Sequence, residues 1–258
     1  MPELPDVEGF RRVLAEHAQG RRISGVEVAD PGVLRNRHSR AFVREVQGCR
    51  FHEPGRHGKW LLGYTDGPIV LFHFGMSGGL VWAPGGERHR HDRVVFALEH
   101  GELRYRDMRK LRGLWLALDE DEAGRIMGPL GPDALDLGRG ELAGRLARHR
   151  GRLKPVLMDQ TVVAGLGNLL VDEILWRSRL NPARPVHSLD TNELATLHRV
   201  MRRVLRDSVP EGRVPPKRRW LTGVRNEKPA VCPRCRHELR KASIGGRTSY
   251  WCPKCQPG

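Results

Sequence analysis

Four cysteines near the C-terminal end of the chain have the spacing of a metal site. They form two C-x2-C pairs, Cys232 with Cys235 and Cys252 with Cys255, separated by 16 residues. Four thiolates at this spacing can close a tetrahedron around Zn²⁺, and each pair is typical of one knuckle of a zinc ribbon. We therefore predict one structural zinc with all its ligands from the protein. The alternative, two disulfides, requires an oxidising compartment. A fifth cysteine, Cys49, is predicted to be an inert core thiol.

The start of the chain could supply a nucleophile. A small second residue lets an aminopeptidase remove Met1, which would leave Pro2 with a free secondary amine. Such an amine can attack C1′ of a sugar, and the resulting iminium permits β-elimination of the 3′ phosphate. The adjacent Glu3 could protonate the sugar ring oxygen and shuttle protons. Taken alone, proline is common at this position, and an acid here is also favoured by a helix dipole.

The elements that must position these residues change in kind along the chain. Apolar residues at helical spacing predict a helix over residues 2–18. The short apolar runs that follow, as far as about residue 118, predict strands of an antiparallel sandwich or barrel. The predicted strands are Ile23–Val28, Trp60–Tyr64, Ile69–Phe74, Arg93–Leu98 and Leu114–Leu118.

The second half of the chain is predicted to be helical. The turn-rich segment 128–132 is a plausible domain boundary, and residues 140–208 have the period of amphipathic helices. The tail, residues 228–258, is too short to fold on a hydrophobic core alone. We predict three domains, over residues 1–128, 129–222 and 223–258.

Composition limits the class of protein. The 258 residues carry a formal net charge of +15, and 39% of them are hydrophobic. No apolar run approaches the roughly 18 residues of a membrane span, and the start of the chain lacks a secretory pattern. Membrane, fibrous and disulfide-scaffold classes are therefore excluded, and a cytoplasmic location is expected. The positive charge favours a nucleic acid as partner.

Three separated segments resemble one family. The start, Pro2–Glu8, is similar to the N-terminus of formamidopyrimidine-DNA glycosylases. Residues 154–173 resemble their helix–two-turn–helix, and the four-cysteine tail with Gly246–Cys252 resembles their zinc finger. The family also includes endonuclease VIII-type enzymes, but Leu4 stands where that branch usually has glycine. The resemblance implies a multi-domain α+β fold: an antiparallel β-sandwich with an N-terminal helix, a helical domain and a zinc ribbon.

The resemblance also implies an activity. It is a bifunctional DNA glycosylase/AP lyase of base excision repair, which excises oxidised bases through an N-terminal proline Schiff base and cleaves the strand by β,δ-elimination. Its catalytic residues would be Pro2, Glu3 and Lys59, which lies on a turn entering a strand. Its partner would be double-stranded DNA with damaged bases or abasic sites, bound by a monomer associated with the bacterial nucleoid.

The residues implied to bind DNA come from several segments. A wedge into the duplex would consist of Met76, Arg109 and Leu111, and the other contacts would come from His73, Asn168 and Arg247. Leu111 replaces the usual aromatic wedge, and Arg112 replaces a glycine. Three alternatives stay open: oxidised-pyrimidine specificity, a non-catalytic damaged-DNA-binding protein, and a zinc-ribbon transcription or translation factor.

Overall fold

The computed structural model describes residues 2–258, so the predicted removal of Met1 lies outside the described residues. The chain divides into two compact units. Unit 1 consists of Pro2 and Asp6–Pro129, and unit 2 consists of Glu3–Pro5 and Leu130–Gly258. Among the described residues, no helix is both long and apolar enough to cross a membrane.

Helix α1 (Leu4–Ala18) opens the described chain. Val7, Leu14 and Ala18 are fully buried in the core of unit 1, as expected from their helical spacing. Asp6 lies inside the first turn, because the helix already begins at Leu4.

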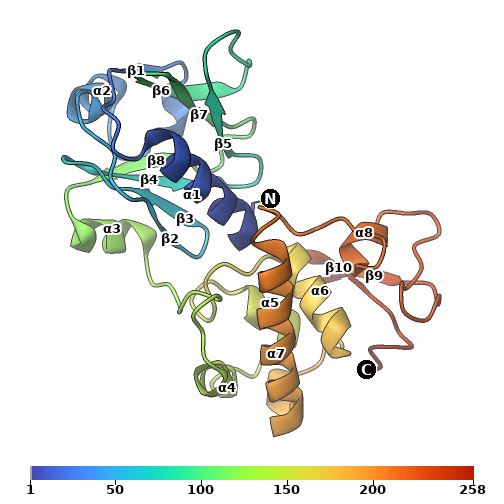
Figure 1. Ribbon diagram of the computed structural model, residues 1–258. Helices are drawn as coiled ribbons and strands as arrows, with labels where there is room; N and C mark the ends of the chain where they lie inside the picture. Colours follow the sequence, from blue (N-terminus) through green and yellow to red (C-terminus); the bar gives the residue numbers. More distant parts are fainter. Residues whose placement is uncertain (1) are drawn as a thin grey trace. The chain divides into compact units, whose positions relative to one another are not determined.

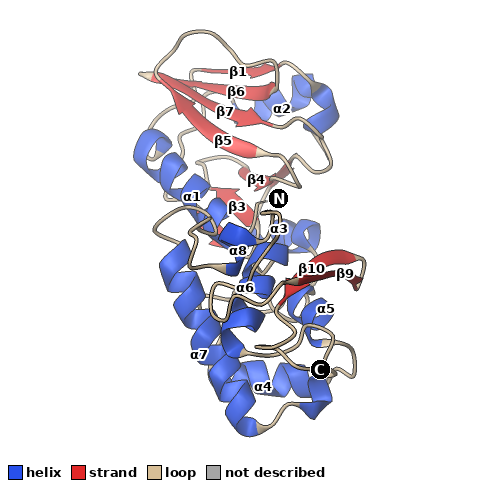
Figure 2. Ribbon diagram, turned by 90° about the vertical axis from the view of Figure 1, so that its right-hand side faces the viewer, coloured by secondary structure: helices blue, strands red, loops and turns tan. Residues whose placement is uncertain are grey.

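Unit 1 contains two antiparallel four-stranded sheets, drawn in Figures 1 and 2. The prediction of an antiparallel β architecture is confirmed. Side chains from β4 and β6, including Phe72 and Phe96, meet in one core, which identifies a sandwich. The first sheet has the order β1 (Gly25–Val28), β6 (Asp92–Leu98), β7 (Gly101–Arg106) and β5 (Gly79–Ala83), and the second has β2 (Gly55–His57), β3 (Trp60–Gly63), β4 (Ile69–His73) and β8 (Leu114–Ala117).

Some short elements of unit 1 were not anticipated. Besides β2, β5 and β7, these are η1 (Pro31–Val33), α2 (Ser39–Val46) and α3 (Glu120–Met127). The two short α-helices have 8 residues each, about two turns, which is too few for a clear period, and they depend on tertiary packing. Helix α2 buries Phe42 and Val46, which stand one turn apart. Helix α3 begins with a cap, in which the Asp119 carboxylate accepts from Glu122 N at 2.7 Å.

Unit 2 is helical with a C-terminal hairpin. Its core combines apolar side chains from α4, α5, α6 and α7 with Leu4. Helix α7 starts with a capping box formed by Asp190 and Glu193. The elements are α4 (Arg139–Ala147), α5 (Leu153–Met158), α6 (Asn168–Ser178), η2 (Val186–Ser188), α7 (Thr191–Ser208), α8 (Leu221–Val224), β9 (Arg240–Ile244) and β10 (Arg247–Trp251).

A buried ion network joins the hairpin to the helices. Lys154 Nζ donates to Asp172 Oδ1 at 2.6 Å and to Thr248 O at 3.2 Å. Arg225 Nη1 donates to Asp172 Oδ2 at 3.0 Å, and its guanidinium stacks on Tyr250 at 4.4 Å. The hairpin and the helices therefore form a single unit. The division of this part into two domains stays a prediction.

Candidate functional site

The Glu3 side chain is held by the start of helix α6. Its Oε1 accepts from Leu169 N at 2.8 Å, and its Oε2 accepts from Leu170 N at 3.0 Å. The side chain is 1% exposed. Two donors from one helix terminus fix both oxygens of the carboxylate, and the helix dipole favours an acid at this end. Pro2, the preceding residue, is partly exposed.

Two glycines make room for this arrangement. A Cβ at Gly167 would come within 2.3 Å of Glu3 Cδ, and a Cβ at Gly165 within 2.6 Å of Leu4 Cδ1. Gly165 also has φ +104, a conformation that favours glycine, and its carbonyl accepts from Leu4 N at 3.1 Å. The glycines of the two-turn segment are thus explained by how closely residues 3 and 4 approach it.

Asn168 is the first residue of α6, after Gly167 at the cap position. Its Oδ1 is enclosed and has no hydrogen-bond partner within residues 2–258. An enclosed polar atom without a partner costs about 1–3 kcal/mol, so this position is not optimised for stability alone. Arg247, the matching residue of the hairpin, is exposed and directly follows the turn at Gly245 and Gly246.

Lys59 directly precedes β3, and His73 ends the adjacent strand β4 of unit 1. Lys59 is half-buried in the two-residue turn between β2 and β3, where Gly58 has φ +58. His73 ends β4 and pairs with Trp60, the residue after Lys59. Burial, followed by the positive charges of Arg112 and Lys59, lowers the pKa of His73 to about 4. Its Nδ1 accepts from Gly75 N at 3.1 Å, so Nε2 of the neutral ring carries the proton and can donate.

The three predicted wedge residues lie on two neighbouring loops of unit 1, after β4 and after β7. Met76 is 39% exposed and Leu111 is 51% exposed, both unusually open for large apolar side chains. Arg109 Nη1 lies 3.1 Å from Met76 Sδ, so these two side chains are in direct contact. The loops therefore present an apolar side chain and a cation together.

Residues that were not predicted from sequence hold these loops in place. Asp107, which is 1% exposed, accepts from Ser77 Oγ at 2.6 Å through its Oδ1. Arg109 N donates to Ser77 Oγ at 3.0 Å and to Asp107 Oδ1 at 3.1 Å. Arg35 Nη2 donates to the carbonyls of Lys110 and Arg112, at 2.6 Å each. Asp107 could have been suspected from its place in the same short segment. Arg35 is about 75 residues away and leaves no local signal.

The four cysteines of unit 2 come together as predicted. Their sulfur atoms all lie within 4.8 Å of one another. Trp176 Nε1 donates to Cys232 Sγ at 3.3 Å, which fixes one thiolate from the helix α6 side. This all-sulfur set fits Zn²⁺ in a closed tetrahedral site, in which the metal would stabilise the hairpin and leave no position for substrate.

The fold and these clusters define a class: a two-unit protein with a helix–two-turn–helix and a four-cysteine hairpin. The chain matches three family descriptions in order: "Formamidopyrimidine-DNA glycosylase N-terminal domain" over residues 1–114, "Formamidopyrimidine-DNA glycosylase H2TH domain" over 130–215 and "Zinc finger found in FPG and IleRS" over 231–258. It is 36% identical to the formamidopyrimidine-DNA glycosylase of Pelotomaculum thermopropionicum over 99% of both chains. The chain therefore belongs to the formamidopyrimidine-DNA glycosylase family.

Solved structures with the same fold contain damaged DNA. The chain is similar to a Lactococcus lactis formamidopyrimidine-DNA glycosylase mutant in complex with Fapy-dG containing DNA, at 27% identity and a TM-score of 0.90. It is equally similar, at 27% identity and a TM-score of 0.90, to the wild-type Lactococcus lactis protein in complex with DNA containing an oxidised pyrimidine. Both matches cover 100% of both chains.

Proposed function

We propose that this protein is a bifunctional DNA glycosylase/AP lyase that removes oxidised bases from double-stranded DNA. The observation that carries the proposal is the Glu3 carboxylate, which is locked by two backbone amides directly after Pro2 in the chain. A general acid must be oriented before the reaction, and these two hydrogen bonds supply that orientation. Family membership and the solved relatives with lesion-containing DNA support the same assignment.

The reaction begins at the amine of Pro2. Its nitrogen attacks C1′, the bond from C1′ to the base breaks, and the departing base takes a proton from water. The Glu3 carboxylate takes the proton that the nitrogen loses and delivers it to the ring oxygen as the bond from C1′ to that oxygen breaks, which gives an iminium. The iminium withdraws electrons, so C2′ loses a proton and the 3′ phosphate departs. A second elimination expels the 5′ phosphate, and water then hydrolyses the iminium to restore the amine.

The remaining predicted residues hold the DNA. Lys59 and the neutral His73 would bind phosphate next to the reacting sugar, with His73 donating through Nε2–H. Met76, Leu111 and Arg109 would fill the gap in the duplex after the damaged base is extruded. Asn168 and Arg247 would bind phosphates on unit 2, and the zinc ribbon would hold Arg247 in place. A monomer in the bacterial cytoplasm suffices for this chemistry.

Trapping of the covalent intermediate tests the mechanism. Borohydride added during turnover should reduce the iminium and link the protein to damaged DNA, with the adduct in the N-terminal peptide. An uncleaved N-terminal tag should abolish base excision and strand cleavage, because an amide nitrogen is not a nucleophile. Lys59→Ala is the matched variant for a lysine nucleophile. A trapped peptide that contains Lys59 instead of Pro2 would falsify the mechanism.

The lesion specificity requires a separate comparison. The solved relatives include complexes with Fapy-dG and with an oxidised pyrimidine, so the fold accommodates both classes. We propose oxidised purines as the main substrates, because Leu4 is typical of the formamidopyrimidine branch. Rates should be measured on duplexes with 8-oxoguanine, formamidopyrimidine, thymine glycol, dihydrouracil or an abasic site. Faster excision of the two pyrimidine lesions would assign the protein to the alternative specificity, and binding without excision to a non-catalytic role.

A further inference from the structure

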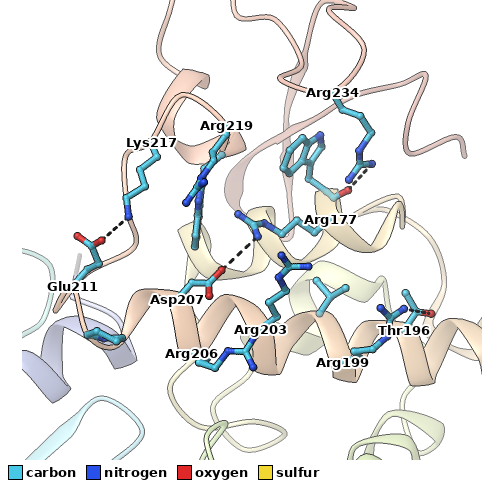
Figure 3. A pocket seen from close by; sticks show the side chains of 14 residues that line it. Arg177, Thr196, Arg199, Arg203, Arg206, Asp207, Glu211, Lys217, Arg219 and Arg234 are labelled. Atoms are coloured by element: carbon cyan, nitrogen blue, oxygen red, sulfur yellow. Dashed lines mark hydrogen bonds and ion pairs between the residues drawn. The ribbon is translucent and has the colours of Figure 1, made fainter.

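Unit 2 contains a cationic cavity that the proposed function does not use. It has a volume of about 730 Å³. Its lining side chains come from the second half of α6, from α7, from the segment after α7 and from the first cysteine knuckle (Figure 3). Seven arginine and lysine side chains line it, against two carboxylates. A concave surface with this excess of positive charge attracts anions.

Neither carboxylate neutralises the row of arginines on α7. Asp207 Oδ2 lies 3.8 Å from Arg177 Nη1, and Glu211 Oε1 lies 2.5 Å from Lys217 Nζ. Within residues 2–258, Arg203 and Arg206 have no hydrogen bond, ion pair or aromatic contact. Like charges on one helix repel one another, so this row lowers stability unless an anion binds it.

The row has a regular geometry. Arg199, Arg203 and Arg206 follow the i, i+4, i+7 pattern and therefore lie on one face of α7. Their Cα atoms span roughly 10 Å along the helix axis. Figure 3 shows Arg203 reaching from α7 toward Arg177 on the opposite side of the cavity. The cavity thus has cations on both sides.

Arginines on the opposite side are held by stacking. The Arg177 guanidinium lies 4.1 Å from the centre of the Trp220 ring, and that of Arg234 lies 4.7 Å from Trp176. Arg177 Nε donates to Glu173 Oε1 at 2.7 Å, and Arg234 Nη1 donates to Trp176 O at 3.4 Å. The remaining N–H groups of the stacked guanidiniums match the oxygens of a phosphate. The two tryptophans are only 2% and 5% exposed. Because the two rings are buried, they do not provide the exposed aromatic surface that commonly anchors a protein partner.

This cavity is distinct from the phosphate contacts already proposed for unit 2. Asn168 begins α6, whereas Arg177 lies nine residues later, which is roughly 13 Å along the helix. Arg247 starts β10 at the tip of the hairpin, whereas Arg234 lies in the first cysteine knuckle. One strand of DNA bound at Asn168 and Arg247 does not account for the cations at the other end of α6.

We propose that this cavity is a second DNA site, which binds the phosphate backbone of an undamaged duplex while the lesion site is occupied. The bound anion would neutralise the α7 row, and several arginines would contact successive phosphates without reading sequence. The protein could then pass from one DNA segment to another through a complex with both. This function extends the proposed one and involves no catalytic residue.

Dissociation kinetics test the second site. A labelled duplex with an uncleavable abasic analogue is bound first and then chased with increasing amounts of an unlabelled, undamaged duplex. The dissociation rate of wild-type protein should rise in proportion to the chase concentration, because the chase binds before release. In the triple variant Arg199→Gln, Arg203→Gln and Arg206→Gln this slope should fall at least tenfold. Glutamine keeps the helix propensity of α7, and circular dichroism checks its folding.

A matched triple variant removes the same charge elsewhere on unit 2. Arg139, Arg148 and Arg150 are exposed and have no side-chain hydrogen bond or ion pair within residues 2–258. Their change to glutamine should leave the slope within twofold of wild type. The proposal would be overturned if the slope fell equally in both triple variants. It would also be overturned if the dissociation rate of the wild-type protein did not depend on the chase concentration. If poly-glutamate of equal charge binds at this row while the undamaged duplex does not, the cavity serves an acidic protein and the DNA assignment is wrong.

Discussion

At the scale of single residues, substitutions of Met76 and Arg109 test whether these side chains act as a wedge in base extrusion. Met76→Ala or Arg109→Ala should lower excision from duplex about tenfold, equivalent to roughly 1.4 kcal/mol. Cleavage at a pre-formed abasic site should change little, because no base has to be unstacked there. Single-turnover rates on the two substrates measure this difference. Leu118→Ala removes another exposed apolar side chain, 70% exposed, and serves as the control. Equal losses on both substrates would mean that these residues support folding.

His73 should make stability depend on pH. Its pKa is about 4 in the folded protein and near 6.5 when unfolded, so below about pH 6.5 only the unfolded chain takes up the proton. The stabilising contribution is therefore complete above about pH 6.5. It falls by up to about 3 kcal/mol as the pH approaches 4.

Denaturant unfolding between pH 4 and pH 7 measures this contribution. His73→Gln should flatten the profile over that range. His100→Gln, at a position where the ring is 71% exposed, should keep the wild-type slope. An identical pH profile for His73→Gln and wild type would show that His73 is not buried in its neutral form.

At the scale of elements, the turn before α6 determines where Glu3 lies. Gly167→Ala places a methyl group within 2.3 Å of Glu3 Cδ and should push the carboxylate off the amides of Leu169 and Leu170. We expect excision to fall at least tenfold, while one zinc per chain is retained. An assay on a lesion-containing duplex measures the excision rate, and metal analysis measures the zinc content per chain.

The same substitution in an open position provides the control. Gly144 lies inside α4, where a Cβ would meet nothing within 4 Å. Gly144→Ala should stabilise the protein by roughly 0.5–1 kcal/mol and leave excision unchanged. If Gly167→Ala is as active as Gly144→Ala, the close approach of Glu3 to α6 does not matter for catalysis.

At the scale of the whole molecule, we expect the zinc site to stabilise unit 2 and to leave the stability of unit 1 unchanged. Cys232 and Cys252 pack with Trp176, Leu221 and Val224 of the helices. Loss of the metal through Cys252→Ser should therefore expose α6 and α8 as well as the hairpin. Hydrogen exchange should show at least tenfold faster exchange in these helices, with β4 and β6 of unit 1 unaffected.

Cys49→Ser is the control for this experiment. Cys49 lies in unit 1 and donates to Glu45 O at 3.4 Å, far in sequence from the four-cysteine cluster. Its loss should leave zinc content and the protection of unit 2 unchanged. Unaltered exchange in α6 of the Cys252→Ser protein would show that the helices fold independently of the ribbon.

The sequence by itself determined the features that depend on local spacing. Four cysteines in two pairs predicted the metal cluster. Short apolar runs located five of the eight strands of unit 1, and helical apolar spacing located α1 and α7. These patterns can be recognised in the sequence because metal-ligand spacing and side-chain periodicity depend on residues that are close together in the chain.

Only the tertiary structure decided how distant residues support one another. The Glu3 carboxylate meets amides 166 and 167 residues away, and Arg35 holds a loop about 75 residues away. The arginine row on α7 lines a cavity only because Arg177 and Arg234 lie opposite it in the fold. Such contacts depend on how the whole chain packs, and no local pattern in a single sequence predicts them.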